Sequence, residues 1–339
     1  NSYGHWGAGL ALLPGGLLWM TNCEVRNNHC GEDDEGGGLA LSGGCAWIKN
    51  STFSGNNAGA GGALWVGDST VIELQDCTFR QNQAGAGGAI SAEDGACVTI
   101  RSSSFHANYA VSGGAAIAVL AGDMSSLAVY DTSFFNNYGE TTGAVSAQDS
   151  TVLISDSRFR ENNAGNMAGD DDDDWQQEND VQPGPGAISI ESSANCQIYR
   201  SEFLSNGGQS AGALFGYFVM VEDSVFLDNS GVYSGGALTG GGKFANCTFG
   251  RSLSYKGAHG HLSSPSSFER CTFFDGTAVE GSALYASGVQ ATVSDSIFHG
   301  FTNVSVASWD LADLICHEFG GAVASCAATD NGGALCMDV

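Results

Sequence analysis

The stretch GGALWVGDSTVIELQDCTFRQN, residues 61–82, decides the fold, because the chain repeats its pattern in the next segment, GGAISAEDGACVTIRSSSFHAN, residues 87–108. Each copy opens with Gly-Gly-Ala and an aliphatic residue, and closes with Phe, two further residues and Asn. A self-similar unit of this length indicates a repeat architecture, in which each unit buries its apolar face against its neighbours.

The closing Phe recurs along almost the whole chain, at intervals of 23 to 29 residues apart from one interval of 44. It stands at positions 53, 79, 105, 134, 159, 203, 226, 249, 273 and 298, and Val25 fills the same slot ahead of them. Seven units also carry the Asn, at positions 56, 82, 108, 137, 162, 206 and 229. We therefore expect about eleven structural units.

The units are typical of strands rather than helices, because each Gly inside a helix costs about 1 kcal/mol. Apolar residues alternate after each Gly-Gly-Ala, and a second alternating pair such as Val98 and Ile100 follows. The third pair, such as Ser103 and Phe105, starts three residues later, so the chain must bend for both pairs to face inward. Three short strands around a triangular coil satisfy this pattern.

Gly-Gly-Ala-Ile paired with Phe-x-x-Asn resembles the repeat of the chlamydial polymorphic outer-membrane proteins, and more broadly the pectin-lyase-like β-helix proteins. The similarity extends from about Trp6 to Phe298. It implies an all-β fold, a single right-handed parallel β-helix of about eleven three-strand coils, but implies little about function. We expect the β-helix over residues 1–300 and an irregular, Cys-containing cap over residues 301–339.

The charge balance excludes several kinds of partner. The chain has 11 Lys and Arg against 37 Asp and Glu, a formal net charge of -26. Nucleic acids bind clustered cations, and anionic membrane surfaces repel such a chain. No stretch reaches the roughly 18–20 consecutive apolar residues of a membrane span. We expect neither nucleic-acid binding nor membrane insertion.

Three Asn-x-Ser/Thr sequons, at Asn50, Asn246 and Asn303, occur in a chain with eleven cysteines. Together with the acidity they favour an extracellular or cell-surface setting with N-linked glycans. Cys316, Cys326 and Cys336 cluster near the C-terminus and are candidates for a disulfide that staples the cap. An odd total leaves at least one cysteine free or paired between molecules.

The residue three before each repeated Phe or Val is predicted to turn the corner of its coil. These residues are Asn22, Asn50, Asp76, Ser102, Asp131, Asp156, Arg200, Asp223, Asn246, Arg270 and Asp295. Asn and Asp suit tight corners because their side chains bond nearby backbone. We expect Arg200 to pair with the Asp residues on either side of it, and the stacked Asp131 and Asp156 are a possible Ca²⁺ site.

The 44-residue interval contains an acidic insertion, residues 169–185. Its possible cation-binding or contact residues are Asp170, Asp171, Asp172, Asp173, Asp174 and Trp175. A run of five Asp is usually a solvated loop, because the charges repel one another. The alternative is a loop that captures a cation or docks a partner through Trp175.

The chain lacks the motifs of an enzyme. His259-Gly260-His261 superficially resembles a Gly-His-Gly motif of polygalacturonases, but the family's acidic and basic partners are missing. Hydrolysis needs two carboxylates at a fixed separation, and the Asp run lies in an insertion. We predict no catalytic residues and no cofactor; a polysaccharide lyase or hydrolase is the least favoured alternative.

The preferred function is an extracellular structural glycoprotein, a rod that stacks end to end with copies of itself into a filament or surface appendage. The prediction rests on the N-terminal segment, which passes directly into the apolar run 7–20 without a helix to cover the first coil. The first alternative is a monomeric adhesin or ligand-binding stalk. The second is a larger protein of which this chain is one segment.

Overall fold

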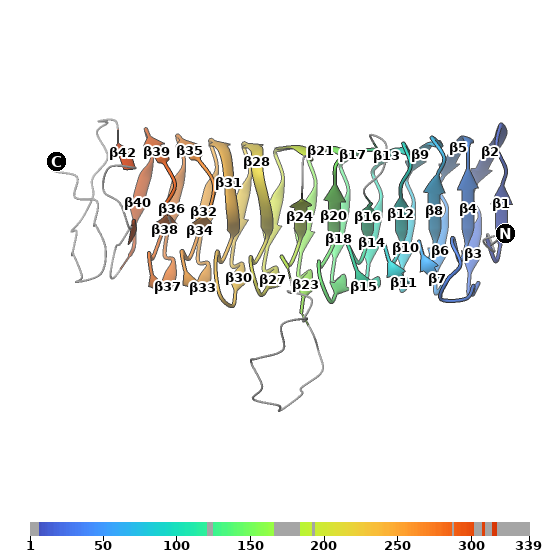
Figure 1. The fold of residues 1–339 in the computed structure, drawn as a ribbon, viewed down its shortest axis with the longest axis horizontal. Helices are drawn as coiled ribbons and strands as arrows, with labels where there is room; N and C mark the ends of the chain where they lie inside the picture. The colour runs from blue at the N-terminus through green and yellow to red at the C-terminus, as the bar shows by residue number, and fades with distance from the viewer. Residues whose placement is uncertain are drawn as a thin grey trace, which may run out of the picture.

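The computed structural model describes residues 7–120, 125–165, 184–191, 194–286 and 288–301, together with two short strands within 307–316. This part of the chain is all β and forms a straight rod of stacked coils, with parallel strands of successive coils side by side (Figure 1). It contains no helix, and hence no helix long and apolar enough to cross a membrane.

One sheet carries the repeated Phe and has eleven strands, one from each coil, as the repeat count predicted. In spatial order they are β3 (Glu24–Arg26), β6 (Thr52–Ser54), β10 (Thr78–Arg80), β14 (Ser104–His106), β18 (Ser133–Phe135), β22 (Arg158–Arg160), β26 (Glu202–Leu204), β29 (Val225–Leu227), β32 (Thr248–Gly250), β36 (Thr272–Phe274) and β40 (Ile297–His299). We call this the Phe sheet.

The largest sheet has twenty-two strands and takes up to two from each coil. The first strands are β1 (Leu10–Leu12), β4 (Leu39–Ser42), β8 (Leu64–Gly67), β12 (Ile90–Ala92), β16 (Ile117–Val119), β20 (Val145–Gln148), β24 (Ile188–Glu191), β34 (Gly260–Leu262), β38 (Leu284–Ala286) and β41 (Ala307–Ser308). The second strands are β2 (Gly16–Thr21), β5 (Gly44–Lys49), β9 (Val71–Gln75), β13 (Cys97–Arg101), β17 (Ser126–Tyr130), β21 (Thr151–Ser155), β25 (Asn195–Tyr199), β35 (Ser266–Glu269), β39 (Ala291–Ser294) and β42 (Leu314–Cys316). β28 (Leu214–Glu222) and β31 (Leu238–Ala245) each run through both positions.

A third sheet of nine short strands follows the repeated Asn and was not expected from the sequence. Its strands are β7 (Asn57–Ala60), β11 (Gln83–Ala86), β15 (Tyr109–Ser112), β19 (Tyr138–Gly139), β23 (Asn163–Ala164), β27 (Gly207–Gly208), β30 (Ser230–Gly231), β33 (Leu253–Lys256) and β37 (Thr277–Glu280). Segments of two to four residues are too short to display an alternating pattern, so sequence periodicity misses them.

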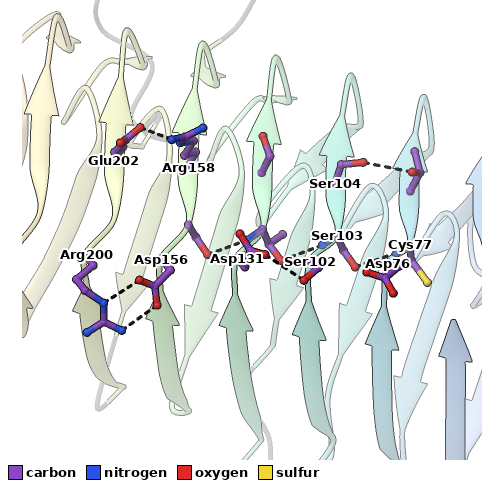
Figure 2. Close-up of a pocket in the computed structure, with 14 residues that line it drawn as sticks. Asp76, Cys77, Ser102, Ser103, Ser104, Asp131, Asp156, Arg158, Arg200 and Glu202 are labelled. Atoms are coloured by element: carbon purple, nitrogen blue, oxygen red, sulfur yellow. Dashed lines mark hydrogen bonds and ion pairs between the residues drawn. The ribbon is translucent and has the colours of Figure 1, made fainter. Parts of the chain in front are cut away.

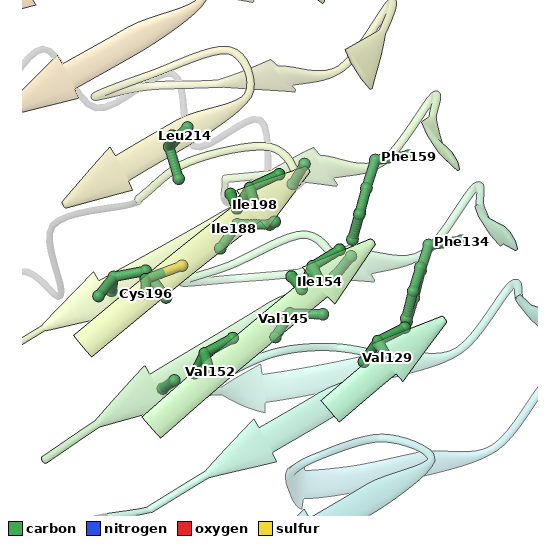
Figure 3. Close-up of a cluster of buried hydrophobic side chains, with 14 of the residues drawn as sticks. Val129, Phe134, Val145, Val152, Ile154, Phe159, Ile188, Cys196, Ile198 and Leu214 are labelled. Atoms are coloured by element: carbon green, nitrogen blue, oxygen red, sulfur yellow. The ribbon is translucent and has the colours of Figure 1, made fainter. Parts of the chain in front are cut away.

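The core consists of columns of like residues, because in-register parallel pairing places equivalent positions one above another. The ten repeated Phe rings form one continuous stack, with successive centroids 4.6–5.0 Å apart and ring planes within 12° of each other. Aliphatic columns from the largest sheet face this stack, as Val129, Ile154 and Ile198 do beside Phe134 and Phe159 (Figure 3).

The seven repeated Asn residues form a buried ladder, and each is at most 1% exposed. The backbone and side-chain nitrogens of Asn108 donate to Oδ1 of Asn137, at 3.1 and 2.9 Å. The side-chain nitrogen of Asn137 in turn donates to the carbonyl oxygen of Phe105, at 3.0 Å. The ladder satisfies backbone groups that the turn would otherwise leave buried without partners.

Each coil turns beside the Phe sheet at two single residues with left-handed backbone. The eleven residues predicted to turn the corner three positions before the Phe all have φ between 45° and 55°, and we call them the corner ladder. A second left-handed residue lies two positions after the Phe, as at Gln81, Ala107 and Asn136. The bend between the second and third strands is thus concentrated on one residue, because the residue before it, such as Arg101, still pairs in its strand.

The predicted cap, residues 301–339, lies outside the described residues except for Phe301, β41 and β42. Those two strands pair in parallel with β38 and β39, so the coil pattern extends beyond residue 300. The acidic insertion, including Asp170 to Trp175, also lies outside the described residues.

Candidate functional site

A groove of about 590 Å³ runs along the rod beside the corner ladder, across the five coils from β10 to β26 (Figure 2). Three positions of each coil line it. The corner ladder contributes Asp76, Ser102, Asp131, Asp156 and Arg200; the next, inward position contributes Cys77, Ser103, Thr132 and Ser157; the outer face of the Phe sheet contributes Thr78, Ser104, Ser133, Arg158 and Glu202. The groove is therefore polar and is built on strands that the core holds in place.

The floor of the groove is a column of Ser and Thr hydroxyl groups. These groups already form hydrogen bonds with the backbone of their own and the neighbouring coil. The backbone N–H of Ser103 donates to Oγ1 of Thr132, and that of Thr132 donates to Oγ of Ser157. Each hydroxyl then donates to the carbonyl two residues earlier, as Thr132 does to Tyr130 at 2.8 Å. Ligand contacts must therefore come from the corner ladder and the outer face of the Phe sheet.

The two arginines of the groove pair with two of its four carboxylates. Arg200 forms a two-pronged hydrogen bond with Asp156, at 2.7 and 2.8 Å, which confirms the predicted pairing on that side. Arg158 pairs with Glu202 at 2.9 Å. Asp131 accepts a hydrogen bond from Ser102, at 3.1 Å. Asp131 thus has no ion-pair partner among the described residues and is available to a ligand.

Two overlapping stretches, residues 1–139 and 37–172, match the sequence profile described as a right handed beta helix region. The chain belongs to this family. The matched residues make up just over half of the chain, and the coils continue beyond them in the same pattern (Figure 1). No curated protein and no solved structure matched this right-handed β-helix.

The pair of Arg200 and Asp156 makes a testable prediction about the groove of the β-helix. Hydrogen bonds from Arg200 and then from Ser155 lower the pKa of Asp156 to about 2. Arg200→Gln is expected to raise this pKa toward the ordinary value of about 3.9, while thermal stability changes little because exposed ion pairs are weak. An NMR titration of the Asp156 carboxyl tests this, and an unchanged pKa would contradict the pairing.

A Ca²⁺ site at Asp131 and Asp156 receives no support from this arrangement. Asp156 is engaged by Arg200, and a calcium ion needs six to eight oxygen ligands. Within the ranges that the structure describes, no group of three or more metal-ligating side chains comes together. The same ion pair keeps Asp156 ionised, so it cannot serve as a general acid near neutral pH.

Two of the three sequons lie on the corner ladder of the β-helix. Asn50 and Asn246 are both exposed, and their side chains donate to Asn22 and Asp223 on the neighbouring coils. Any glycans at these two positions would therefore project from the same edge of the rod. Asn303 lies outside the described residues.

The cysteines in the described part of the β-helix are free thiols. Cys23, Cys77, Cys247 and Cys271 occupy the inward position that Ser or Thr fills in other coils. Cys247 and Cys271 lie on adjacent coils, and no disulfide joins them. The candidate staple of Cys316, Cys326 and Cys336 lies outside the described side chains.

His259 is part of the core and not of a surface site. It replaces the small Ala of other coils, and Gly260 next to it replaces their aliphatic residue, pairing with Leu238 and Leu284. Its ring is fully buried beside Phe249 and Phe273, and no hydrogen bond to either ring nitrogen occurs among the described residues. The exchange of large and small residues conserves volume within one coil.

Burial lowers the pKa of His259 to about 3, and the backbone of Phe274 opposes this only in part. An unfolded His titrates near 6.5, so the unfolded chain binds more protons below that pH and acid destabilises the fold. Between pH 8 and pH 5 this contributes about 2 kcal/mol of lost stability.

The double variant His259→Ala/Gly260→Leu restores the Ala-Leu pair of both neighbouring coils and is expected to remove that acid sensitivity. Urea unfolding at pH 8 and pH 5 measures it, with His299→Ala at an exposed position as the control. The interpretation would be wrong if the double variant and the parent lost the same stability on acidification.

A second row of charged residues, which was not predicted from the sequence, lies at the left-handed corner two positions after the repeated Phe. There Arg251 makes a two-pronged hydrogen bond with Asp228, with both distances 2.7 Å. Asp275 follows on the next coil and also raises the pKa of Arg251. The signal was present, because Asp228, Arg251 and Asp275 each stand two residues after a repeated Phe and alternate in charge.

Proposed function

We propose that this right-handed β-helix is an extracellular structural rod without catalytic activity, which stacks end to end with other copies into a filament. The observation that carries the proposal is the edge of the first coil that has no partner among the described strands. β1, β2 and β3 pair with β4, β5 and β6 of the second coil, and no described strand pairs with their other edge. An open strand edge is a template for pairing with another chain.

The first coil also offers the apolar columns of the core to a partner. Leu12, Leu18, Met20 and Val25 occupy inward positions that are fully buried in later coils, but here they are only half-buried. Val25 ends the Phe column. A coil of another copy placed on this edge would extend both the strand ladders and the core columns.

An extracellular setting is supported by the exposed sequons at Asn50 and Asn246 and by the acidic surface. N-linked glycans on the corner ladder would project sideways from the rod and leave its ends free to stack. The net charge of -26 opposes binding to nucleic acid or to anionic membranes. The partner we propose is therefore the chain itself.

Electron microscopy of the protein at neutral pH, with and without a chelator, tests the filament. We expect continuous fibres in both conditions, and loss of fibres in chelator would add a role for Ca²⁺. Leu18→Glu/Met20→Glu, at inward positions of β2, should abolish the fibres, whereas Leu17→Glu/Trp19→Glu, at outward positions of the same strand, should preserve them. Isolated rods of the unchanged protein would overturn the proposal.

The second candidate is a monomeric ligand-binding stalk or adhesin, which the polar groove along β10 to β26 favours. Its repeated hydroxyl and carboxylate positions would suit an extended, hydroxyl-rich ligand lying along the rod axis. If the unchanged protein forms isolated rods, and Asp131→Ala weakens its binding to an immobilised glycan panel, the stalk becomes the better account.

A further inference from the structure

A bulge interrupts the largest sheet where β28 and β31 each continue from the first strand position of the coil to the second. The pairing shifts between Gly216 and Val219, which forces Tyr217 and Phe218 outward. Phe218 has a left-handed backbone, with φ of 58°, and its ring is 74% exposed. A bulky residue in this conformation is a true outlier, and such outliers cluster at functional sites.

The neighbouring coil carries three successive glycines next to this bulge, Gly240, Gly241 and Gly242. A Cβ atom at Gly240 or Gly242 would lie only 2.0 Å from the carbonyl oxygen of Gly216 or Val219, so no side chain fits there. The glycines thus let β31 approach β28 closely, and Gly242 lines a notch of about 450 Å³ in the side of the rod. Its walls include Phe218, Met220, Lys243, Pro265, Gln290 and Thr292.

Lys243 brings a free positive charge to the notch. Every Lys and Arg of the chain except Arg80 and Lys243 has an ion-pair partner among the residues that the structure describes. The residues that pair with Lys243 on the adjacent strands are Met220 and Ser267, and both are uncharged. On a strongly acidic protein this cation is available to an anion.

We propose that the notch binds a small carboxylate with an apolar ring, which packs against Phe218 while its carboxylate pairs with Lys243. The apolar wall of Phe218, Met220 and Pro265 suits the ring, because flat apolar groups gain from contact with an exposed aromatic face. Gln290 and Thr292 also line the notch and supply hydrogen-bonding groups. This proposal is independent of the filament.

Calorimetric and NMR titrations with phenylacetate and its neutral counterpart phenylacetamide test the proposal on the full chain. Phenylacetate should bind severalfold more tightly than phenylacetamide. Lys243→Gln should weaken phenylacetate binding roughly threefold to fivefold, the range of an exposed ion pair, and leave phenylacetamide binding unchanged. Arg80→Gln removes the other unpaired cation, outside the notch, and should change neither.

Phe218→Gly tests the ring without the risk of unfolding, because Gly adopts the left-handed backbone more readily than Phe. It should weaken both probes by about tenfold while the melting temperature stays the same or rises. Equal binding of the two probes, or full binding by Phe218→Gly, would overturn the proposal. Self-association that Phe218→Gly abolishes would also overturn it, and would assign the ring to a second copy of the chain.

Discussion

Phe134→Ala is expected to lower the free energy of unfolding by about 3–5 kcal/mol, the range for a fully buried ring. The ring is fully buried and stacks on both sides, with centroids 5.0 Å from Phe105 and 4.6 Å from Phe159. Removing it leaves a cavity between two coils and interrupts the stack. Neighbours cannot close that space, because strand pairing fixes the spacing between coils.

The adjacent residue supplies a matched control for this prediction. Phe135 has the same side chain one position further along β18, but it faces outward and is 39% exposed. Phe135→Ala should cost less than about 1 kcal/mol. Chemical denaturation of both variants measures the difference, and equal losses would show that the Phe column does not carry the stability of the rod.

Asn137→Ala is expected to cost about 3–6 kcal/mol, because it removes a hydrogen bond from each of three buried polar groups at about 1–3 kcal/mol each. These are the backbone and side-chain nitrogens of Asn108, which donate to Asn137, and the carbonyl oxygen of Phe105, which accepts from it. No water can replace the amide without opening the core. The loss should therefore match or exceed that of many apolar truncations.

Asn163→Ala tests whether burial, rather than the residue type, sets this cost. Asn163 is exposed, and among the described residues its side chain donates only to the carbonyl oxygen of Glu161. We expect a change within about 0.5 kcal/mol. Amide hydrogen exchange provides a second readout, since exchange of the Asn108 amide should accelerate in Asn137→Ala and remain slow in Asn163→Ala. Slow exchange in both variants would contradict the role of the ladder.

The fold could be predicted well from the sequence, because the inward-facing residues recur at fixed offsets within each repeat. The Phe column, the Asn ladder and the corner ladder could all be found by spacing, since each requires one residue type at a fixed offset. The short strands of the third sheet could not, because their pairing depends on the neighbouring coil. The bulge between Gly216 and Val219 could not be predicted either, because it is a change in the pairing register of two strands.

The candidate sites were predicted less well, because a site depends on which side chains meet across coils. Pairing of Arg200 with Asp156 followed from the corner ladder and was confirmed. The groove along β10 to β26 combines three positions per coil, and no single spacing reports all three. The notch at Phe218 depends on the left-handed backbone of that residue and on side chains of several adjacent coils. Only the run Gly240-Gly241-Gly242 stands out from the repeat in the sequence.

The break of 44 residues between Phe159 and Phe203 leaves the columns intact. These two rings lie 5.0 Å apart, and Asn162 still bonds Asn206 at 3.0 Å, as in coils without an insertion. The stacking of coils thus depends on the residues at the repeated positions and not on the number of residues between them. Foreign peptides inserted between β23 and β24 should therefore leave the protein able to fold. For the same reason the gene could lengthen during evolution by duplicating whole coils, while the loops at this edge vary in sequence and length.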